Sequence, residues 1–447
     1  MKLFKHQIDN ARRLANAIMD EKFAMDASQT GTGKSLTALQ VAKELGRPVF
    51  IIAPKSTHAQ WISVAKAFFK SAFDDMFTGV VNAEALRSKA CGEITETDRY
   101  TKQVIWRINS PIKSSLLVWD EFHKGCSGRT SGLTQLFIDA SRRSGGLLAM
   151  SATPAMTPLQ SRAISVASGI CQSNPKAFET FALKHGCVKA TWFPGRPLQF
   201  NGGMQKASEN MAQIRAEMTS AGAVVTRTLS SQVKDFPETE IISYPCEILQ
   251  SQDSKELFNA VSGSISRANS LSARIKMRVL VESAKAPAIS DFTEELASQG
   301  YSVVIFCAFH ETIGQLAASF IRKKIAYHTI TGETAQGARG EILESFAKDE
   351  RRVLLLQISA GGTGLSLHKT SEAQRDRVSI VNPCENSADF IQAFGRVQRA
   401  GGNFTRQFIP VVPDSEEEKI MSLYKAKKAG LEALCGQQPQ EQKQEKK

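Results

Sequence analysis

Long apolar runs are absent from this sequence. The longest, such as residues 303–309 and 353–356, have the length of a core strand, whereas a membrane-spanning helix needs roughly 20 apolar residues. The first residues also lack the apolar segment of a signal peptide. These absences indicate no membrane role.

Paired cysteines and internal repeats are absent as well. The eight cysteines are scattered along 447 residues without a C-x-x-C pair, which argues against a disulfide framework or a cysteine-based zinc site. We therefore expect reduced thiols, which favours a cytoplasmic location. The length leaves room for two or three domains, each with a hydrophobic core of its own.

Acidic residues are the minority among the charged ones. The chain has 44 Asp and Glu against 56 Lys and Arg, which gives a formal net charge of +12. An excess of this size favours a polyanionic partner. A solvated basic surface would give the same count and remains the alternative.

Short apolar runs alternate with helical patterns in both halves of the chain, which is typical of parallel α/β sheets. The predicted strands are residues 49–53, 116–119, 147–150, 303–306, 326–331, 353–357, 378–381 and 407–411. The predicted helices are residues 35–45, 290–299, 311–323 and 341–348. Ligands bind beyond the carboxyl ends of such strands, so the polar motifs that follow them are candidate sites.

This pattern predicts two α/β lobes in tandem. The first spans residues 1–230, with helical elaboration from about residue 155, and the second spans residues 286–430. Residues 231–285 are interpreted as a crossover and helical segment between the lobes. The polar tail at 436–447 is expected to be disordered.

The first lobe contains a phosphate-binding loop, Ser-Gln-Thr-Gly-Thr-Gly-Lys-Ser, at residues 28–35. Small residues let consecutive backbone N–H groups turn towards an anion, and the helix that follows points its positive end at the same place. The expected ATP ligands are Thr30, Gly31, Thr32, Gly33, Lys34 and Ser35. Lys34 would reach the β- and γ-phosphates, and the Ser35 hydroxyl would bind Mg²⁺. A glycine-rich turn without catalysis is the alternative.

Two carboxylates follow the predicted strand at 116–119. Asp120 is expected to hold Mg²⁺, and Glu121 to orient or deprotonate the attacking water. An Asp-Glu pair in this position is also common as a helix N-cap. The phosphate loop upstream favours the catalytic interpretation.

Three weaker motifs lie further along the chain. Ser151 and Thr153 follow a predicted strand, so their hydroxyls should lie in the same crevice and link it to the second lobe. A glycine-rich turn at 359–366 ends another strand. Arg396 and Arg399 are three apart on one predicted helical face and could act as arginine fingers on a γ-phosphate. A surface helix with two solvated arginines is the alternative.

The order of these motifs resembles that of the superfamily 2 helicases and translocases. The matching segments are Gln7 in Phe-Lys-His-Gln, the phosphate loop, Ala-Pro-Lys-Ser-Thr at 53–57, Asp-Glu-Phe-His at 120–123, Ser-Ala-Thr at 151–153, Gly-Gly-Thr-Gly at 361–364 and Gln-x-x-Gly-Arg-x-x-Arg at 392–399. The segments at 60–61, 225–237, 353–367 and 416–420 are similar to the Swi/Snf-type branch. The compact chain also resembles phage-encoded branch-migration helicases. Two departures are Phe122, in place of the usual Ala or Cys, and Ser-Ala-Thr in place of Gly-Thr.

The resemblance implies an α/β fold of two RecA-like lobes and a role for each matching residue. Gln7 would read the adenine, and Gly364 would lie near the nucleotide. The coupling residues would be His123, Ser151, Thr153 and Gln392. The nucleic-acid track would be lined by Pro54, Lys55, Ser56, Thr57, Gly361, Gly362 and Thr363, whose amides and hydroxyls suit phosphate contacts.

Two further segments have open interpretations. Trp192 and Arg196 flank a Pro-Gly turn and could stack on bases at a junction, or could anchor a buried loop. The basic cluster at 322–324 ends a predicted helix and could cap its dipole.

These observations favour an ATP- and Mg²⁺-dependent DNA translocase that remodels branched or forked DNA. The alternatives are a 3′–5′ strand-separating helicase and a nucleotide-switched DNA-binding scaffold without turnover. RNA is the less favoured substrate, and no protein partner is indicated. If the protein is phage-encoded, the expected location is the host cytoplasm.

Overall fold

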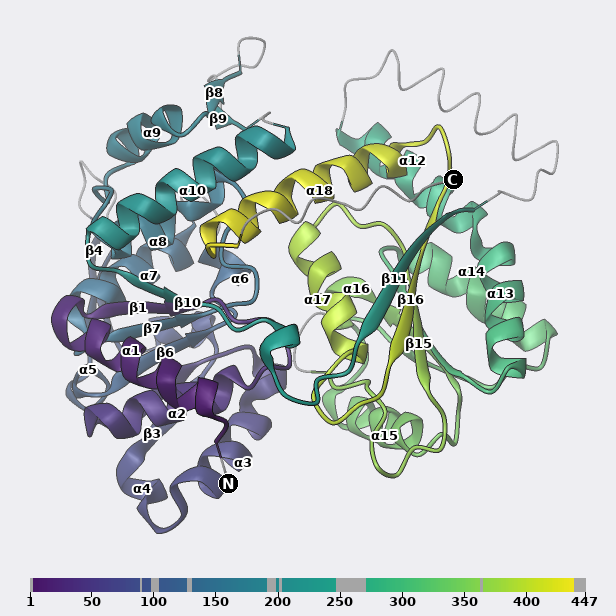
Figure 1. The fold of residues 1–447 in the computed structure, drawn as a ribbon, viewed down its shortest axis with the longest axis horizontal. Helices are drawn as coiled ribbons and strands as arrows, with labels where there is room; N and C mark the ends of the chain where they lie inside the picture. The colour runs from purple at the N-terminus through teal and green to yellow at the C-terminus, as the bar shows by residue number, and fades with distance from the viewer. Residues whose placement is uncertain are drawn as a thin grey trace. The chain divides into compact units, whose positions relative to one another are not determined.

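The computed structural model describes residues 3–88, 91–97, 104–126, 131–190, 198–200, 203–246, 271–361 and 365–437. The chain divides into unit 1, residues 1–233 with 425–447, and unit 2, residues 234–424 (Figure 1). Each unit contains a six-stranded sheet in which every pairing is parallel. The predicted pair of parallel-sheet lobes is thus confirmed.

The sheet of unit 1 has the order β10-β1-β7-β6-β2-β3. Its strands are β1 (Phe23–Asp26), β2 (Val49–Ile52), β3 (Phe77–Val81), β6 (Leu116–Asp120), β7 (Leu147–Met150) and β10 (Val224–Thr226). Alternate residues of β6 belong to two cores: Leu116 and Val118 pack with one set of helices, and Leu117 and Trp119 with another. This alternation follows from the two-residue period of a strand.

Helices cover both faces of this sheet (Figure 1). One face packs against α1 (Lys5–Glu21), α2 (Lys34–Leu45) and α3 (His58–Phe69). The other packs against α7 (Gly132–Arg143), α8 (Arg162–Ala167), α9 (Pro175–Lys184) and α10 (Met204–Ser220). The predicted helical elaboration after residue 155 therefore forms the cover of one sheet face.

Shorter elements complete unit 1. They are η1 (Lys55–Thr57), η2 (Lys70–Ala72), α4 (Phe73–Met76), η3 (Ala83–Arg87), α5 (Ser110–Ser114), α6 (His123–Cys126), η4 (Pro158–Ser161) and η5 (Ser230–Gln232). Two antiparallel pairs join β4 (Gly92–Thr97) to β5 (Val104–Ile108) and β8 (Val188–Lys189) to β9 (Leu198–Gln199).

The sheet of unit 2 has the order β11-β16-β15-β12-β14-β13. Its strands are β11 (Thr239–Pro245), β12 (Ser302–Cys307), β13 (Tyr327–Ile330), β14 (Val353–Gln357), β15 (Arg377–Val381) and β16 (Thr405–Val411). The helices of this segment are α12 (Leu271–Ala284), α13 (Ala286–Ser298), α14 (His310–Arg322), α15 (Gln336–Ala347), α16 (Ile358–Gly361), α17 (Ser387–Val397) and α18 (Glu416–Leu434). Residues of α13 and α14 share one core, and residues of α15 and α17 share the other.

Two boundaries differ from the sequence-based ones. Strand β11 lies inside the predicted crossover, where it pairs with β16 at the edge of the sheet. Most of its side chains are exposed or half-buried, so it has no apolar run that would predict a core strand. The last residues of α18, from Lys425, belong to unit 1. Gly436 and Gln437 are placed, and 438–447 lie outside the described residues.

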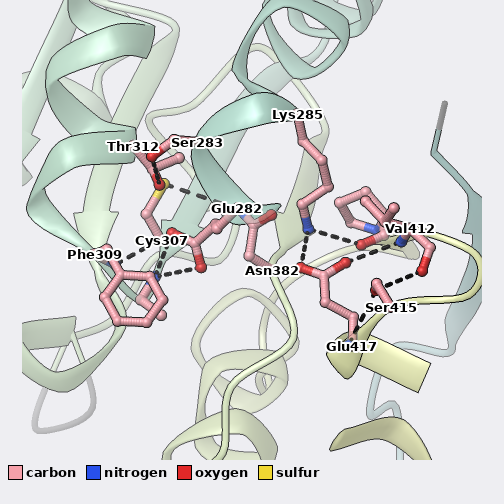
Figure 2. A network of polar contacts seen from close by, with 12 residues as sticks. Glu282, Ser283, Lys285, Cys307, Phe309, Thr312, Asn382, Val412, Ser415 and Glu417 are labelled. Carbon is pink, nitrogen blue, oxygen red and sulfur yellow. Dashed lines mark hydrogen bonds and ion pairs between the residues drawn. The ribbon is translucent and has the colours of Figure 1, made fainter. Parts of the chain in front are cut away.

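A buried polar network fastens the beginning of α18 within unit 2 (Figure 2). Lys285 is fully buried, and its Nζ lies 2.7 Å from Glu417 Oε1 and donates to the Pro410 carbonyl at 3.0 Å. Glu417 Oε2 accepts from the Val412 N–H at 2.9 Å. A buried charge needs such partners to offset lost hydration. The network therefore ties the start of α13 to the end of β16.

Among the described residues, no helix combines the length and apolar character that crossing a membrane requires.

Candidate nucleotide site

The phosphate-binding loop connects β1 to α2 at the carboxyl edge of the unit 1 sheet. Gly31 and Gly33 have φ values of 83° and 92°, a region that favours glycine. Gln7 is buried, and its Nε2 lies 3.5 Å from the carbonyl oxygens of Thr32 and Gly33. A Cβ at Gly33 would come within 2.1 Å of that Nε2. The backbone conformation favours glycine here, and a side chain at this position would also displace the Gln7 amide.

Lys34 is the first residue of α2, and its ammonium is folded back onto the loop. Nζ donates to the carbonyls of Ser28 at 2.8 Å and Gln29 at 3.1 Å. Removal from water lowers the pKa of Lys34, and the carboxylates of Glu121, Asp26 and Asp120 oppose this shift. Lys34 therefore lies within electrostatic range of both predicted catalytic carboxylates.

Asp120 is the last residue of β6. Its Oδ2 accepts a hydrogen bond from Trp61 Nε1 at 3.0 Å. Burial, followed by the neighbouring Glu121, raises the pKa of Asp120 to about 7. The site thus holds adjacent carboxylates whose negative charge a divalent cation would neutralise.

Glu121 begins a chain of polar contacts that leads to the Ser-Ala-Thr motif. Its φ of 49° is uncommon for a residue other than glycine. Oε2 lies 3.4 Å from His123 Nδ1, which in turn lies 2.8 Å from Ser151 Oγ. Ser151 Oγ accepts from the Thr153 N–H at 2.9 Å. The structure therefore brings together four residues that the sequence placed in one crevice.

Phe122 points into the core. Its side chain is buried, and its ring centroid lies 5.2 Å from that of Phe137. The departure from Ala or Cys in the Asp-Glu-x-His box is therefore accommodated by packing beneath the sheet.

In unit 2, Arg396 and Arg399 do not share a helical face. Helix α17 ends at Val397, because Gln398 is extended and its Nε2 donates to the Pro237 carbonyl at 2.8 Å. Arg396 is buried, with Nη2 at 3.5 Å from Gln392 Oε1. Arg399 lies beyond the helix and donates to Ser366 Oγ at 2.6 Å. The prediction of one shared helical face is wrong.

The predicted nucleic-acid residues are only partly described. Lys55 and Ser56 are exposed in η1, whereas Thr57 is buried and donates its hydroxyl proton to the Pro54 carbonyl at 2.8 Å. Gly361 ends α16. The residues that lie outside the described part of the chain are Gly362, Thr363, Gly364, Trp192 and Arg196.

The basic cluster at 322–324 has a structural partner. Lys323 Nζ lies 2.5 Å from a carboxylate oxygen of both Asp291 and Glu294. These hydrogen bonds raise the pKa of Lys323. The central lysine thus binds α13, rather than only capping its own helix.

Sequence reasoning missed two residues next to the loop. Asp26 is buried at the end of β1, and its Oδ1 accepts from the Ser28 N–H at 2.9 Å. Arg227 Nη1 donates to the carbonyls of Ala27 at 2.7 Å and Ala152 at 3.3 Å. The signal for Asp26 was the short apolar run 23–25 that precedes it. Arg227 had no signal beyond its place in a Swi/Snf-like segment.

The residues present fit a Mg²⁺ ion that is shared with a triphosphate. Asp120 supplies a carboxylate, and the Ser35 hydroxyl lies in the first turn of α2 beside Lys34. In the described part of the chain, no group of three or more His, Cys, Asp or Glu residues is arranged to hold a metal alone. Mg²⁺ commonly takes one or two carboxylates and completes its shell with phosphate oxygens and water.

Comparisons with known proteins match both halves of the chain. Residues 1–156 match the family described as Type III restriction enzyme, res subunit, and residues 285–401 match the Helicase conserved C-terminal domain. A protein of Acanthamoeba polyphaga mimivirus, named as an ATP-dependent RNA helicase, is 25% identical over an alignment covering 97% of this chain and 83% of that protein.

Partial matches include DNA repair protein RAD5 of Gibberella zeae, 31% identical over 28% of this chain. This alignment covers 11% of RAD5. The solved SWI2/SNF2 ATPase core of Sulfolobus solfataricus, in complex with dsDNA, has a TM-score of 0.38 and 15% identity. The superposition covers 97% of this chain and 95% of that one.

ATP use follows from the helicase-type domains in both halves of the chain. The phosphate loop, the Asp-Glu-x-His box, the order of the remaining motifs and the helicase-type matches in both halves identify the chain as a superfamily 2 helicase-type ATPase.

Proposed function

We propose that the protein hydrolyses ATP to move along DNA and to remodel branched DNA at forks or junctions. The observation that carries hydrolysis is geometric: Lys34 begins the helix after β1, and Asp120 ends β6 with Glu121 directly after it, at the carboxyl edge of the same parallel sheet. A binding scaffold without turnover would not need both carboxylates at this position.

In this proposal, each site residue of unit 1 has one role. Asp120 and Ser35 would hold Mg²⁺, which would neutralise charge on the phosphates. Lys34 leaves its loop carbonyls and binds the β- and γ-phosphates. Glu121 orients the attacking water, and His123 keeps Glu121 in position through the 3.4 Å contact between Nδ1 and Oε2. Gln7 reads the adenine.

The arginines of unit 2 act on the transferring phosphoryl group, where they offset the negative charge of the transition state. Arg399 is the better candidate for direct contact because Arg396 is buried beside Gln392. Arg396 would then act indirectly, through its contact with Gln392 inside α17.

DNA is favoured as the track for two reasons. The net charge of +12 suits a polyanion, and the partial relatives include DNA repair protein RAD5. Lys55 and Ser56 are exposed in η1 and could bind backbone phosphates, which position a strand without reading its sequence.

RNA is the second candidate, favoured by the mimivirus relative that aligns with nearly the whole chain. A 3′–5′ strand-separating helicase is a third, because it would use the same nucleotide site. Neither changes the assignment of Lys34, Asp120 and Glu121.

The deciding experiment compares stimulation of ATP hydrolysis by single-stranded DNA, duplex DNA, forks, four-way junctions and RNA under one salt condition. Lys34→Ala serves as the matched inactive control. We expect the greatest stimulation from forks or junctions. Preference for single strands would favour unwinding, and preference for RNA would overturn the assigned track.

A further inference from the structure

A hydrogen bond connects the candidate metal ligand to α3, the helix that directly follows the candidate nucleic-acid track in unit 1. Trp61 lies on α3 with only 2% of its surface exposed. Its Nε1–H donates to Asp120 Oδ2 at 3.0 Å. The bond joins the helix that follows the Ala-Pro-Lys-Ser-Thr segment to the Asp-Glu box, between residues that are 59 positions apart.

Trp61 follows the track residues closely, in one continuous helical stretch. The turn η1, which exposes Lys55 and Ser56, runs directly into α3, so Trp61 lies in the first turns of the helix that follows. His58 Nε2 lies 3.0 Å from the Ala53 carbonyl and holds the start of α3 to the end of β2. A displacement of η1 therefore moves the indole by rotation or translation of one short helix.

We propose that Trp61 is a positioning residue that fixes the orientation of the Asp120 carboxylate for Mg²⁺. When nucleic acid binds at Lys55–Thr57, Trp61 transmits the resulting movement of α3 to Asp120. This inference rests on the proposed role of Asp120 in metal binding. The indole N–H holds one carboxylate oxygen and thereby fixes the orientation of the other. Partners of this kind commonly change metal affinity or activity by about 10–100-fold when they are removed.

The alternative is that Trp61 serves only to pack the core, with no effect on metal binding. Trp61 belongs to the core that includes α1 and α2, and a buried indole usually finds an acceptor for its N–H. The distinguishing point is the acceptor, a carboxylate at the carboxyl end of β6, where the structure also places Glu121 and the charge of Lys34. A purely structural role predicts lower stability with unchanged metal affinity.

The test measures Mn²⁺ binding by electron paramagnetic resonance, with a non-hydrolysable ATP analogue, in the presence and absence of duplex DNA. Trp61→Phe keeps an aromatic ring and removes the donor. We expect the Mn²⁺ affinity to fall by about 10-fold or more, and any dependence of that affinity on DNA to disappear. Unchanged Mn²⁺ affinity and DNA dependence in a folded variant would overturn the proposal.

Phe69→Leu is the matched control. Phe69 lies at the end of the same helix, is nearly buried and packs on Phe68 with ring centroids 5.1 Å apart. We expect this variant to lose thermal stability and to keep the Mn²⁺ affinity of the natural protein. An equal loss of affinity in both variants would mean that general damage to α3 explains the result.

A second variant covers the case in which Trp61→Phe does not fold. β-(3-Benzothienyl)alanine at position 61 keeps the bicyclic shape and replaces the N–H by sulfur, so it deletes the hydrogen bond alone. The same loss of Mn²⁺ affinity is expected, and full affinity would overturn the proposal.

On an Asp120→Asn background, Trp61→Phe should cause no further loss of Mn²⁺ affinity, because it acts through Asp120. A further loss of the same size would contradict that route. Failure of the proposed function appears separately, as absence of nucleic-acid-stimulated hydrolysis in the natural protein.

Discussion

Charged side chains that are half-buried in unit 1 and buried in unit 2 have different partners. In unit 1, Lys34 binds two loop carbonyls, and the carboxylates around it are Asp120, Glu121 and Asp26. In unit 2, Lys285 pairs with Glu417 at 2.7 Å. Glu282 accepts from the backbone N–H groups of Ala308 and Phe309, at the turn from β12 to α14 (Figure 2).

This difference in partners distinguishes the ligand site of unit 1 from the structural network of unit 2. The β1–α2 turn of unit 1 is a glycine loop whose backbone suits an anion from outside, whereas the β12–α14 turn of unit 2 already holds the carboxylate of Glu282. Both solutions satisfy the positive end of a helix. In unit 1, the phosphates of a bound nucleotide would supply the negative charge at the positive end of the helix. In unit 2, the side chain of Glu282 supplies it.

The largest effect is expected from Arg399→Ala. A loss of turnover in this variant would show that unit 2 takes a direct part in hydrolysis. Loss of an arginine finger commonly lowers kcat by about 10³–10⁵-fold. Nucleotide binding should persist, and Arg399→Lys should not restore the rate, because an ammonium lacks the planar fork. Phosphate release and equilibrium nucleotide binding measure the two quantities.

Arg406→Ala is the control for that experiment. Arg406 lies in the same unit, is exposed and pairs with Glu240 at 3.3 Å. We expect near-normal turnover. If Arg399→Ala behaved like Arg406→Ala, the arginines of unit 2 would have no role in hydrolysis.

Glu121→Gln is expected to lower kcat by about 10²–10⁴-fold, the range for a group that acts as acid or base in the transition state. ATP binding should be preserved because Lys34 and the loop are untouched. The same substitution in unit 2, Glu282→Gln, should leave turnover within about twofold. Single-turnover kinetics compare the pair, and equal losses would remove the functional distinction between the two carboxylates.

Lys285→Met should act on stability. It leaves Glu417 buried without its cation, and breaking a buried pair in this way costs about 3–5 kcal/mol. Urea unfolding would record the loss, while turnover per folded molecule should be retained. Replacing Glu417 with leucine in the same variant should recover much of the stability. A loss of turnover without a loss of stability would contradict the structural assignment.

The smallest effect concerns pH. Burial raises the pKa of Glu282 from its ordinary 4.5 to about 7 in the folded protein. The folded state therefore favours the protonated form, and the stability that this group contributes is fully present below pH 4.5 and is lost as pH rises through 7.

Each pH unit inside that window removes up to about 1.4 kcal/mol. Glu282→Gln should flatten this slope and make the protein comparatively more stable at pH 8. Denaturant unfolding between pH 5 and 8 checks the slope, and an unchanged slope would show that Glu282 titrates normally.

Most of the core strands were predictable because their residues form continuous apolar runs. β6, β7 and β14 match the predicted ranges to within one residue. The strands of the two six-stranded sheets that were missed are β1, β3, β10 and β11. β1 has an apolar run of only three residues, and most side chains of the other three are half-buried or exposed. The end of α17 was also missed, since the extended conformation of Gln398 depends on a contact with Pro237, which is 161 residues away.

The candidate site shows the same division. Gly33, Lys34, Asp120 and Glu121 were predictable because their spacing along the chain is itself the chemical requirement. The packing of Gln7 against Gly33, the inward position of Phe122 and the bond from Trp61 to Asp120 were not, because each joins segments that are distant in sequence.

By itself, the sequence determined the class of fold, the phosphate loop and the type of reaction. Apolar periodicity and the local spacing of glycine, lysine and carboxylates act over only a few residues. Tertiary structure alone decided which polar groups share a partner. It placed Trp61 on Asp120, Glu282 on the β12–α14 turn and Lys285 on Glu417. Burial and hydrogen bonding between distant segments set these pairings, and no local pattern encodes them.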